Sequence, residues 1–505
     1  MIKLIYRIES DYMSKKRMLI VTSVTLSVVT ISLGIVKLYQ TYALSNYIGT
    51  VTDTGIDVYI NDDSYASIPA NGSSNVYYML TNTNPGTVKY GVAYQTTSGV
   101  TVKVYDTSED PATGTIEEND KKYIKLHLEN KNSTNKTIEL STVLGYENGG
   151  DLVVPSGVTL VTDTYTPPPT AAEYITKLYT TASKTTVTNN SITYNTAPSV
   201  SLMNDRLGGT TTDLDGGNIR YYGASPNNYI YFNCSDYSNQ TSSTCETWRI
   251  IGVFDGKLKL IRGSQIGTYS WDNKDTSTGA ESNFGKNDWT TARLMKLLNP
   301  SDYYTTDSND NNLGQGLYYN SASGKCYSGQ NNATVDCNFT STGIKNDITR
   351  NMIAETTYNL GGWNSNTVYP NLMYEKERGT TVYTGRPTTP WTGKIALAYT
   401  SDYGYAADLN QCKDKTLYDY NNSTCTSNNW MKAIITNNGS NSGWLLTPNS
   451  GNSYYAWYVD SVGYVSNYSI AYSAFGAVPV LSLSSELGIE SGGDGSSSNP
   501  YKLSA

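Results

Sequence analysis

Residues 47 to about 163 alternate hydrophobic and polar positions in short runs. Clusters of Gly, Asn, Asp or Pro separate the runs, for example NTNPG at 82–86 and ENGGD at 147–151. Such alternation puts one face of each strand on a core, and short strands at this spacing are typical of a sandwich. The pattern predicts an all-β, antiparallel, immunoglobulin-like sandwich over 47–163. The seven runs are 56–60, 75–80, 89–96, 100–106, 122–130, 136–146 and 158–165.

A proline run interrupts this alternation at 166–172, where the sequence reads TPPPTAA. Consecutive prolines favour a stiff, extended spacer, so the run predicts a domain boundary. In the segment that follows, 171–184, apolar residues recur at helical spacing, which indicates a short amphipathic helix. Residues 164–200 are therefore expected to form a linker that carries one helix.

The rest of the chain, 201–505, mixes strand and helix patterns. Its clearest hairpin is 248–262, in which an Asp-Gly dipeptide that suits a tight primed turn joins two apolar runs. A helix is predicted at 289–300, where a proline ends it. Further apolar runs between 444 and 485 indicate a final β region. Together these elements predict an α+β domain.

One long apolar segment lies near the N-terminus. Residues 18–36 are 19 positions without a charged side chain, close to the length that crosses a bilayer as a helix. Lys15, Lys16 and Arg17 precede it, and the positive-inside rule keeps such residues in the cytoplasm. The pattern predicts a cytoplasmic stub at 1–17, a single-pass anchor in the cell membrane at 18–36, and an extracellular remainder. A cleaved signal peptide is the alternative, with an unusually long apolar core.

All six cysteines lie between residues 234 and 425, in the predicted α+β domain, and none forms the C-x-x-C pair of a zinc site. They fall into three neighbouring couples, separated by 11, 11 and 13 positions. An even number of cysteines behind an export signal indicates disulfides. Other connectivities are open, but the couples favour local pairing. The predicted disulfides are Cys234–Cys245, Cys326–Cys337 and Cys412–Cys425.

Composition narrows the classes of function. The formal net charge is -8, so the chain lacks the basic surface that a nucleic-acid backbone requires. The sole histidine, His127, lies within a predicted strand, and a serine or cysteine nucleophile would therefore lack its usual base. No catalytic residue is predicted, and we expect a protein that is not an enzyme.

Two acidic loops contain candidate ligands for a calcium ion. Asp213 and Asp215 lie in one loop, and Asp307 and Asp310 lie in the other. Oxygen ligands at alternate loop positions suit calcium, although neither loop has the twelve-residue pattern of an EF-hand. Ordinary Asx turns explain such stretches equally well. Calcium is the one cofactor that the sequence suggests.

Seven motifs of the predicted α+β domain are distinctive. They are WRIIGVF (248–254), IGTYSWDN (266–273), LMKLLNP (294–300), SGWLLTPNSG (442–451), YYAWYVDSVGYV (454–465), GAVPVLSLSS (476–485) and GDGSSSNPYKLS (493–504). Together they resemble those of a family of uncharacterised bacterial surface proteins of Gram-positive type. The C-terminal module of that family is similar to the C-type-lectin-like fold of formylglycine-generating and sulfatase-modifying proteins, and the resemblance implies this fold for about 200–505. The family's Arg in G-V-R-P-V-L and the reactive cysteine pair of the formylglycine-generating branch have no counterpart here, so no activity is carried over.

Tyrosine is the unusual residue of this chain, with 45 Tyr against 5 Phe. It combines a rigid ring with a polar tip and suits half-exposed binding surfaces, such as antibody paratopes. Residues 452–473 concentrate this composition in a predicted two-stranded ribbon whose turn lies at 460–463. Plain β packing, with Trp457 in the core, is the alternative for this segment. The predicted ligand-binding residues are Tyr454, Tyr455, Trp457, Tyr458, Tyr464, Asn467, Tyr468 and Tyr472.

The favoured function is that of a cell-surface recognition or adhesion protein whose C-terminal domain binds an extracellular glycan or protein. One alternative is a carbohydrate-active or cell-wall enzyme with a carboxylate pair. A passive structural surface module is another. The mixture of Tyr, Asn, Ser and Asp also resembles the variable proteins of diversity-generating retroelements.

Overall fold

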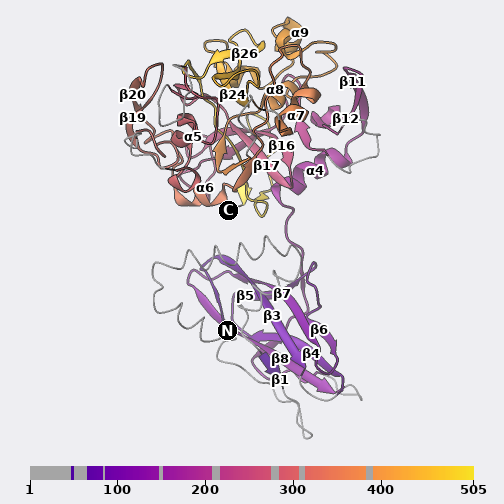
Figure 1. Cartoon of the computed structure of the whole chain (residues 1–505). Coiled ribbons are helices and arrows are strands. Elements are labelled where there is room, and N and C mark those ends of the chain that lie inside the picture. The colour runs from indigo at the N-terminus through magenta and orange to yellow at the C-terminus, as the bar shows by residue number, and fades with distance from the viewer. Residues whose placement is uncertain are drawn as a thin grey trace. The chain divides into compact units, whose positions relative to one another are not determined.

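The computed structural model divides the chain into two compact units, Met1–Pro167 and Pro168–Ala505 (Figure 1). The division falls within the predicted proline-rich spacer. The structure describes residues 47–49, 65–82, 86–146, 152–206, 217–273, 284–305, 313–380, 382 and 390–504.

The described part of the first unit contains two five-stranded sheets around one core. Ile124, Leu126 and Leu128 of β7 are fully buried in this core, as the alternating pattern requires. The edge strands β1 and β10 pair in parallel with β3 and β5, which departs from the predicted antiparallel arrangement. One sheet has the order β1 (Tyr47–Gly49), β3 (Gly72–Asn82), β7 (Lys121–Asn130), β5 (Val100–Tyr105) and β10 (Thr164–Tyr165). The other has the order β2 (Tyr65–Ile68), β8 (Lys136–Tyr146), β4 (Val88–Gln95) and β6 (Thr113–Ile116), with β9 (Val158–Leu160) also paired to β4.

A nine-stranded sheet organises the second unit. Its β16–β17 hairpin is the one predicted, and both turn residues, Asp255 and Gly256, have positive φ, at 49° and 70°. Glycine and aspartate tolerate that conformation, which matches the twist of the two strands. In order, the strands are β11 (Thr185–Asn189), β12 (Ile192–Ala197), β13 (Leu202–Asn204), β14 (Ile219–Tyr221), β16 (Glu246–Phe254), β17 (Lys257–Arg262), β28 (Val480–Ser482) and β23 (Ile395–Ala396), with β15 (Tyr229–Phe232) paired to β16.

A five-stranded sheet and three two-stranded pairs complete the strands described in the second unit. The five-stranded sheet has the order β18 (Thr268–Ser270), β27 (Ala474–Gly476), β24 (Gly443–Pro448), β25 (Tyr455–Val459) and β26 (Val465–Ile470). The pairs are β19 (Ser323–Tyr327) with β20 (Thr334–Asn338), β21 (Thr356–Tyr358) with β22 (Trp391–Gly393), and β29 (Gly488–Ile489) with β30 (Leu503–Ser504).

The helix expected in the linker is part of the second unit instead. It begins after Thr170, whose side chain forms a capping box with Glu173, and it buries Ile175 and Tyr179 in the core that β16 and β17 share. The helix predicted at 289–300 is shorter than expected, because only 293–298 is helical. The α-helices of this unit are α4 (Ala171–Thr181), α5 (Arg293–Leu298), α6 (Asp347–Met352), α7 (Pro370–Arg378), α8 (Thr400–Tyr405), α9 (Ser423–Ser427) and α10 (Lys432–Ile435).

The structure contradicts the predicted fold class and the predicted single-pass membrane localisation. Strands predominate, and the longest helix in the described residues, α4, has 11 residues. At 1.5 Å per residue such a helix is about 17 Å long, well short of the bilayer core. No helix that the structure describes is long and apolar enough to cross a membrane. The predicted stub and anchor, 1–17 and 18–36, lie outside the described residues.

Candidate functional site

The tyrosine-rich segment forms one end of the five-stranded sheet. Strand β25 pairs with β24 on one side and with β26 on the other, and all of these pairings are antiparallel. The turn between β25 and β26 lies where the sequence predicts it, since the backbone N–H of Gly463 donates to the carbonyl of Asp460 at 2.8 Å. The ribbon is therefore continuous with a larger sheet.

Five aromatic rings follow one another along this ribbon, and we call them the aromatic row. Tyr468 contacts Tyr455, with ring centroids 5.8 Å apart, and Tyr455 contacts Tyr454 at 4.7 Å. Phe284 then joins Tyr454 at 5.0 Å and Tyr472 at 6.0 Å. Tyr468 is 62% exposed, while the other four rings are half-buried. The row thus offers aromatic surface to solvent while each ring contacts a neighbour.

Two of the predicted ligand-binding residues lie in the interior. Trp457 is fully buried, and its indole N–H donates to the carbonyl of Trp363 at 3.0 Å. Asn467 is also fully buried, and its side-chain amide forms no hydrogen bond with the residues that the structure describes. Trp457 therefore supports the ribbon from the core side, and neither residue presents a surface to a ligand.

Tyr458 and Tyr464 make ring contacts outside the aromatic row. The ring of Tyr458 packs on Phe475 at 5.0 Å, and the ring of Tyr464 packs on the exposed Tyr418 at 5.3 Å. Burial, together with Tyr458 and Asp460, raises the pKa of Tyr464 above its usual value. Of the eight predicted residues, the structure brings Tyr454, Tyr455, Tyr468 and Tyr472 into one row.

Phe284 is the member of the row that sequence reasoning missed. It lies in the segment NFGKND, more than 150 positions before the ribbon, and no periodic pattern there indicates an aromatic contact. Nearby, the side-chain amide of Asn287 donates to the carbonyls of Asn452 and Tyr455, at 3.1 and 2.6 Å. These bonds bring the Phe284 segment to the start of β25.

The three predicted disulfides are present: Cys234–Cys245, Cys326–Cys337 and Cys412–Cys425. All six cysteines are buried. Three disulfides are consistent with an extracellular protein, because reducing compartments keep thiols free.

The structure does not test the predicted calcium loops, and it places the histidine among packing contacts. Asp213, Asp215, Asp307 and Asp310 lie outside the described residues. In the part of the chain that is described, no group of three or more His, Cys, Asp or Glu is placed to hold a metal ion. His127 is nearly buried and stacks on Tyr165, with centroids 3.6 Å apart. Burial lowers its pKa, which suits a packing role.

A cluster of four buried charges was not predicted. Arg220 on β14 donates from Nε to Asp205 at 2.5 Å and from Nη1 to Asp402 of α8 at 2.8 Å. Lys259 on β17 donates from Nζ to the other oxygen of Asp402 at 2.5 Å. All four side chains are at least 94% buried. We call these residues the charge cluster; two cations and two carboxylates balance its formal charge.

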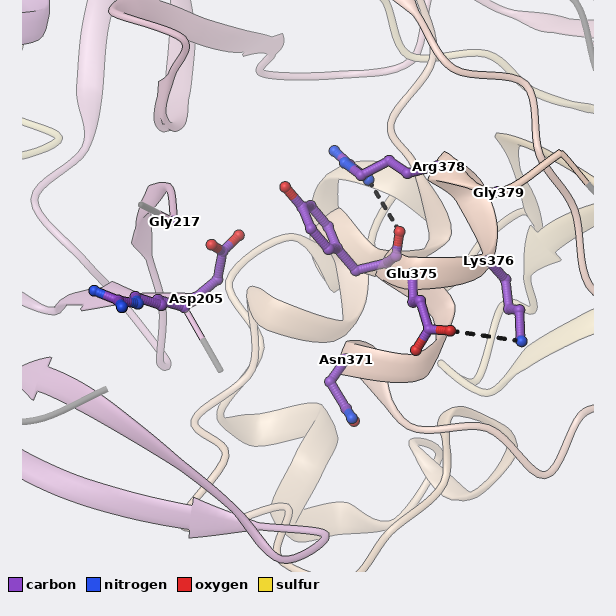
Figure 2. Close-up of a pocket in the computed structure, with 9 residues that line it drawn as sticks. Asp205, Gly217, Asn371, Glu375, Lys376, Arg378 and Gly379 are labelled. Carbon is purple, nitrogen blue, oxygen red and sulfur yellow. Dashed lines mark hydrogen bonds and ion pairs between the residues drawn. The ribbon is translucent and has the colours of Figure 1, made fainter. Parts of the chain in front are cut away.

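A pocket of about 620 Å³ lies beside the charge cluster. Figure 2 shows Asp205 on one side and the polar side chains of α7 on the other. Arg378 lies over the ring of Tyr374, 3.4 Å from its centroid, and also donates to the carbonyl of that residue at 3.3 Å. The described lining mixes both signs of charge. It consists of Asp205, Arg206, Gly217, Asn371, Tyr374, Glu375, Lys376, Arg378 and Gly379.

Comparison with known proteins leaves the chain without an assigned family. No family model, no curated protein and no solved structure matches it. The resemblance of its motifs to bacterial surface proteins with a lectin-like module stays a prediction.

Proposed function

We propose that the second unit is a non-catalytic recognition module that binds an extracellular glycan through the aromatic row. The single observation that carries this proposal is the unbroken contact of five rings, from Tyr468 to Tyr472, along one ribbon.

The chemistry of the row suits a sugar. The ring of tyrosine is a flat apolar surface on which the C–H face of a sugar can stack, and its hydroxyl can bond to sugar hydroxyls. Tyrosine also loses little conformational entropy on binding, because its side chain has only two torsions. Tyr468 is the most exposed of the five, so it is the first contact that a ligand would make.

The support beneath the row favours a preorganised site. Trp457 is held by its bond to the Trp363 carbonyl, and Asn287 is bonded to the carbonyl of Tyr455. A site whose rings are already held in place loses less entropy when ligand binds. The ribbon is therefore better suited to recognition than a loop of the same composition.

The small exposed area of the row favours a glycan over a protein. Neighbouring rings lie with centroids 4.7 to 6.0 Å apart, and only Tyr468 is mostly exposed. A stable protein interface buries about 800 Å² on each partner, which needs a broad patch. Five rings, four of them half-buried, suit the smaller contact area of one polysaccharide chain.

Binding to a glycan panel, followed by titration calorimetry, tests the proposal. We expect the oxidised full-length chain to capture a polysaccharide and Tyr468→Ala to weaken this binding about tenfold, an effect of roughly 1.4 kcal/mol. Tyr468→Phe separates stacking from hydrogen bonding, since it removes only the hydroxyl. Tyr65→Ala is the matched control, because it removes an exposed tyrosine (54%) from the first unit. A folded parent that binds no glycan, or a Tyr468→Ala variant that binds as the parent does, contradicts the proposal.

A further inference from the structure

Lys259 and Asp402 meet in the interior of the second unit, although 143 positions separate them in the chain. Lys259 lies on β17, in the nine-stranded sheet, and Asp402 lies in the first turn of α8. Nζ of Lys259 is 2.5 Å from Oδ2 of Asp402, and the two side chains are 6% and 0% exposed. An amine and a carboxyl group are thus held in contact out of reach of bulk water.

The surroundings of this contact prepare the carboxyl group for attack. Arg220 Nη1 donates to Oδ1 of Asp402 at 2.8 Å, which withdraws electron density from Cγ. The backbone N–H of Tyr399 donates to Oδ2 at 3.0 Å. The rings of Phe254 and Tyr399 lie 4.8 and 4.7 Å from Nζ and form apolar walls around the amine.

We propose that Lys259 and Asp402 form an intramolecular isopeptide bond. Nζ of Lys259 attacks Cγ of Asp402, the bond from Cγ to Oδ2 breaks, and an amide replaces the ammonium and the carboxylate. The ammonium brings three protons, of which the amide keeps one, and the other two leave with Oδ2 as water. The reaction therefore balances without an oxidant, a cofactor or an external acid. This inference is independent of the proposed glycan binding.

The fold holds Nζ of Lys259 close enough to Cγ of Asp402 for attack. Because Cγ is one bond away from Oδ2, Nζ lies roughly 3–3.5 Å from the carbon that it attacks, the range of a near-attack arrangement. Because the fold holds the two groups together continuously, the amine has a very high effective concentration at the carboxyl group.

Burial also favours the neutral product. Charges removed from water cost several kcal/mol each unless partners compensate them, and the amide removes one charge of each sign. Arg220 and Asp205 remain as a balanced pair. Burial lowers the pKa of the Lys259 ammonium, although Asp402 acts against this, and a lower pKa eases the loss of the proton that precedes attack. Burial alone would raise the pKa of Asp402, but Lys259 and Arg220 outweigh it and hold this pKa at about 2, so the reaction starts from the ion pair.

The bond gives the fold a cross-link that reduction cannot break. It joins the nine-stranded sheet to α8 and closes a loop of 143 positions, whereas the disulfides close loops of 11, 11 and 13. A longer closed loop restricts the unfolded chain more strongly. The second unit would therefore keep its long-range connection in a reducing environment.

Intact-mass spectrometry of the purified full-length chain tests the proposal, after all cysteines are reduced and alkylated. We expect a mass lower than the sequence requires by one water, and a protease digest in which the Lys259 peptide is joined to the Asp402 peptide. Lys259→Met should restore the full mass. The control is Lys394→Met, because Lys394 is a partly buried lysine of this unit that donates to the carbonyl of Ile353, and its loss should leave the water loss in place.

Two results would overturn the proposal. One is a parent chain of full mass that yields Lys259 in an ordinary linear peptide. The other is a water loss that persists in Lys259→Met, which would assign it to a different reaction. Because the mass of the parent decides the first result, the test does not depend on whether Lys259→Met folds.

Discussion

The ring of Tyr468 meets the ring of Tyr455 edge to face, with an interplanar angle of 73° and a centroid distance of 5.8 Å. Tyr468 lies on β26 and Tyr455 on β25, so the contact crosses the ribbon between paired strands. Such aromatic pairs add about 0.5–1.5 kcal/mol beyond the area that they bury. The half-buried Tyr455 thus orients the exposed Tyr468.

Truncation of Tyr468 should cost much less stability than truncation of Trp457. Tyr468→Ala removes a side chain that is 62% exposed, so we expect the free energy of unfolding to fall by less than about 1 kcal/mol while ligand binding weakens. Trp457→Ala leaves a large cavity in the core and should cost roughly 3–5 kcal/mol. Urea denaturation of both variants measures the difference. Equal losses would mean that Tyr468 is part of the core packing.

The buried carboxyl group of Asp272 should make the stability of the protein depend on pH. It is fully buried, and burial raises its pKa from 3.8 to about 7, although the backbone N–H groups of Lys286 and Arg293 oppose this shift. The folded state therefore binds a proton that the unfolded state has released, and stability falls as the pH rises from about 4 to 7.

Asp272→Asn should remove this contribution. Relative to the parent, the variant should gain stability across that window, by at most about 4 kcal/mol, and the gain should level off above pH 7. Urea titrations at several pH values measure it. A stability difference between variant and parent that does not change with pH would contradict the assignment.

The features that the sequence predicted correctly depend on residues that are close in the chain. The β16–β17 hairpin follows from an Asp-Gly turn between two apolar runs, and the disulfides join the nearest cysteines. The ribbon was also predicted, but the pairing of β25 with β26 shifts register between Ala456 and Tyr458. Strict alternation therefore does not assign every residue of the ribbon to a face.

The features that the sequence did not predict depend on contacts between distant segments. Arg220 and Asp402 are 182 positions apart, and neither has another charged residue within four positions of it in the sequence. Phe284 enters the aromatic row through tertiary packing alone. Period and composition carry no information on which distant segments meet, so neither the charge cluster nor the complete row could be read from one sequence.

The Cys412–Cys425 disulfide should contribute about 3 kcal/mol to stability, as expected for a closed loop of this length. The double variant Cys412→Ala/Cys425→Ala should therefore unfold at a lower urea concentration than the parent. Adding reductant should then shift the variant less than the parent, because one of the three bonds is already absent. An identical shift in the parent and the double variant would show that this disulfide does not stabilise the fold by restricting the unfolded chain.

Arg220 should be the most sensitive residue of the charge cluster. It is 1% exposed and pairs with Asp205, so Arg220→Met leaves the buried Asp205 carboxylate without its cation even where Lys259 and Asp402 are joined as an amide. Removing one partner of a buried ion pair typically lowers the free energy of unfolding by about 3–5 kcal/mol, because the remaining charge is shielded from water. Arg262→Met is the control: Arg262 pairs with Glu246 at 3.1 Å, but both side chains keep more than 10% exposure, so water compensates part of the loss. In urea unfolding at neutral pH, Arg220→Met should have a much lower free energy of unfolding than Arg262→Met. The reverse order would mean that the charge cluster does not stabilise this unit.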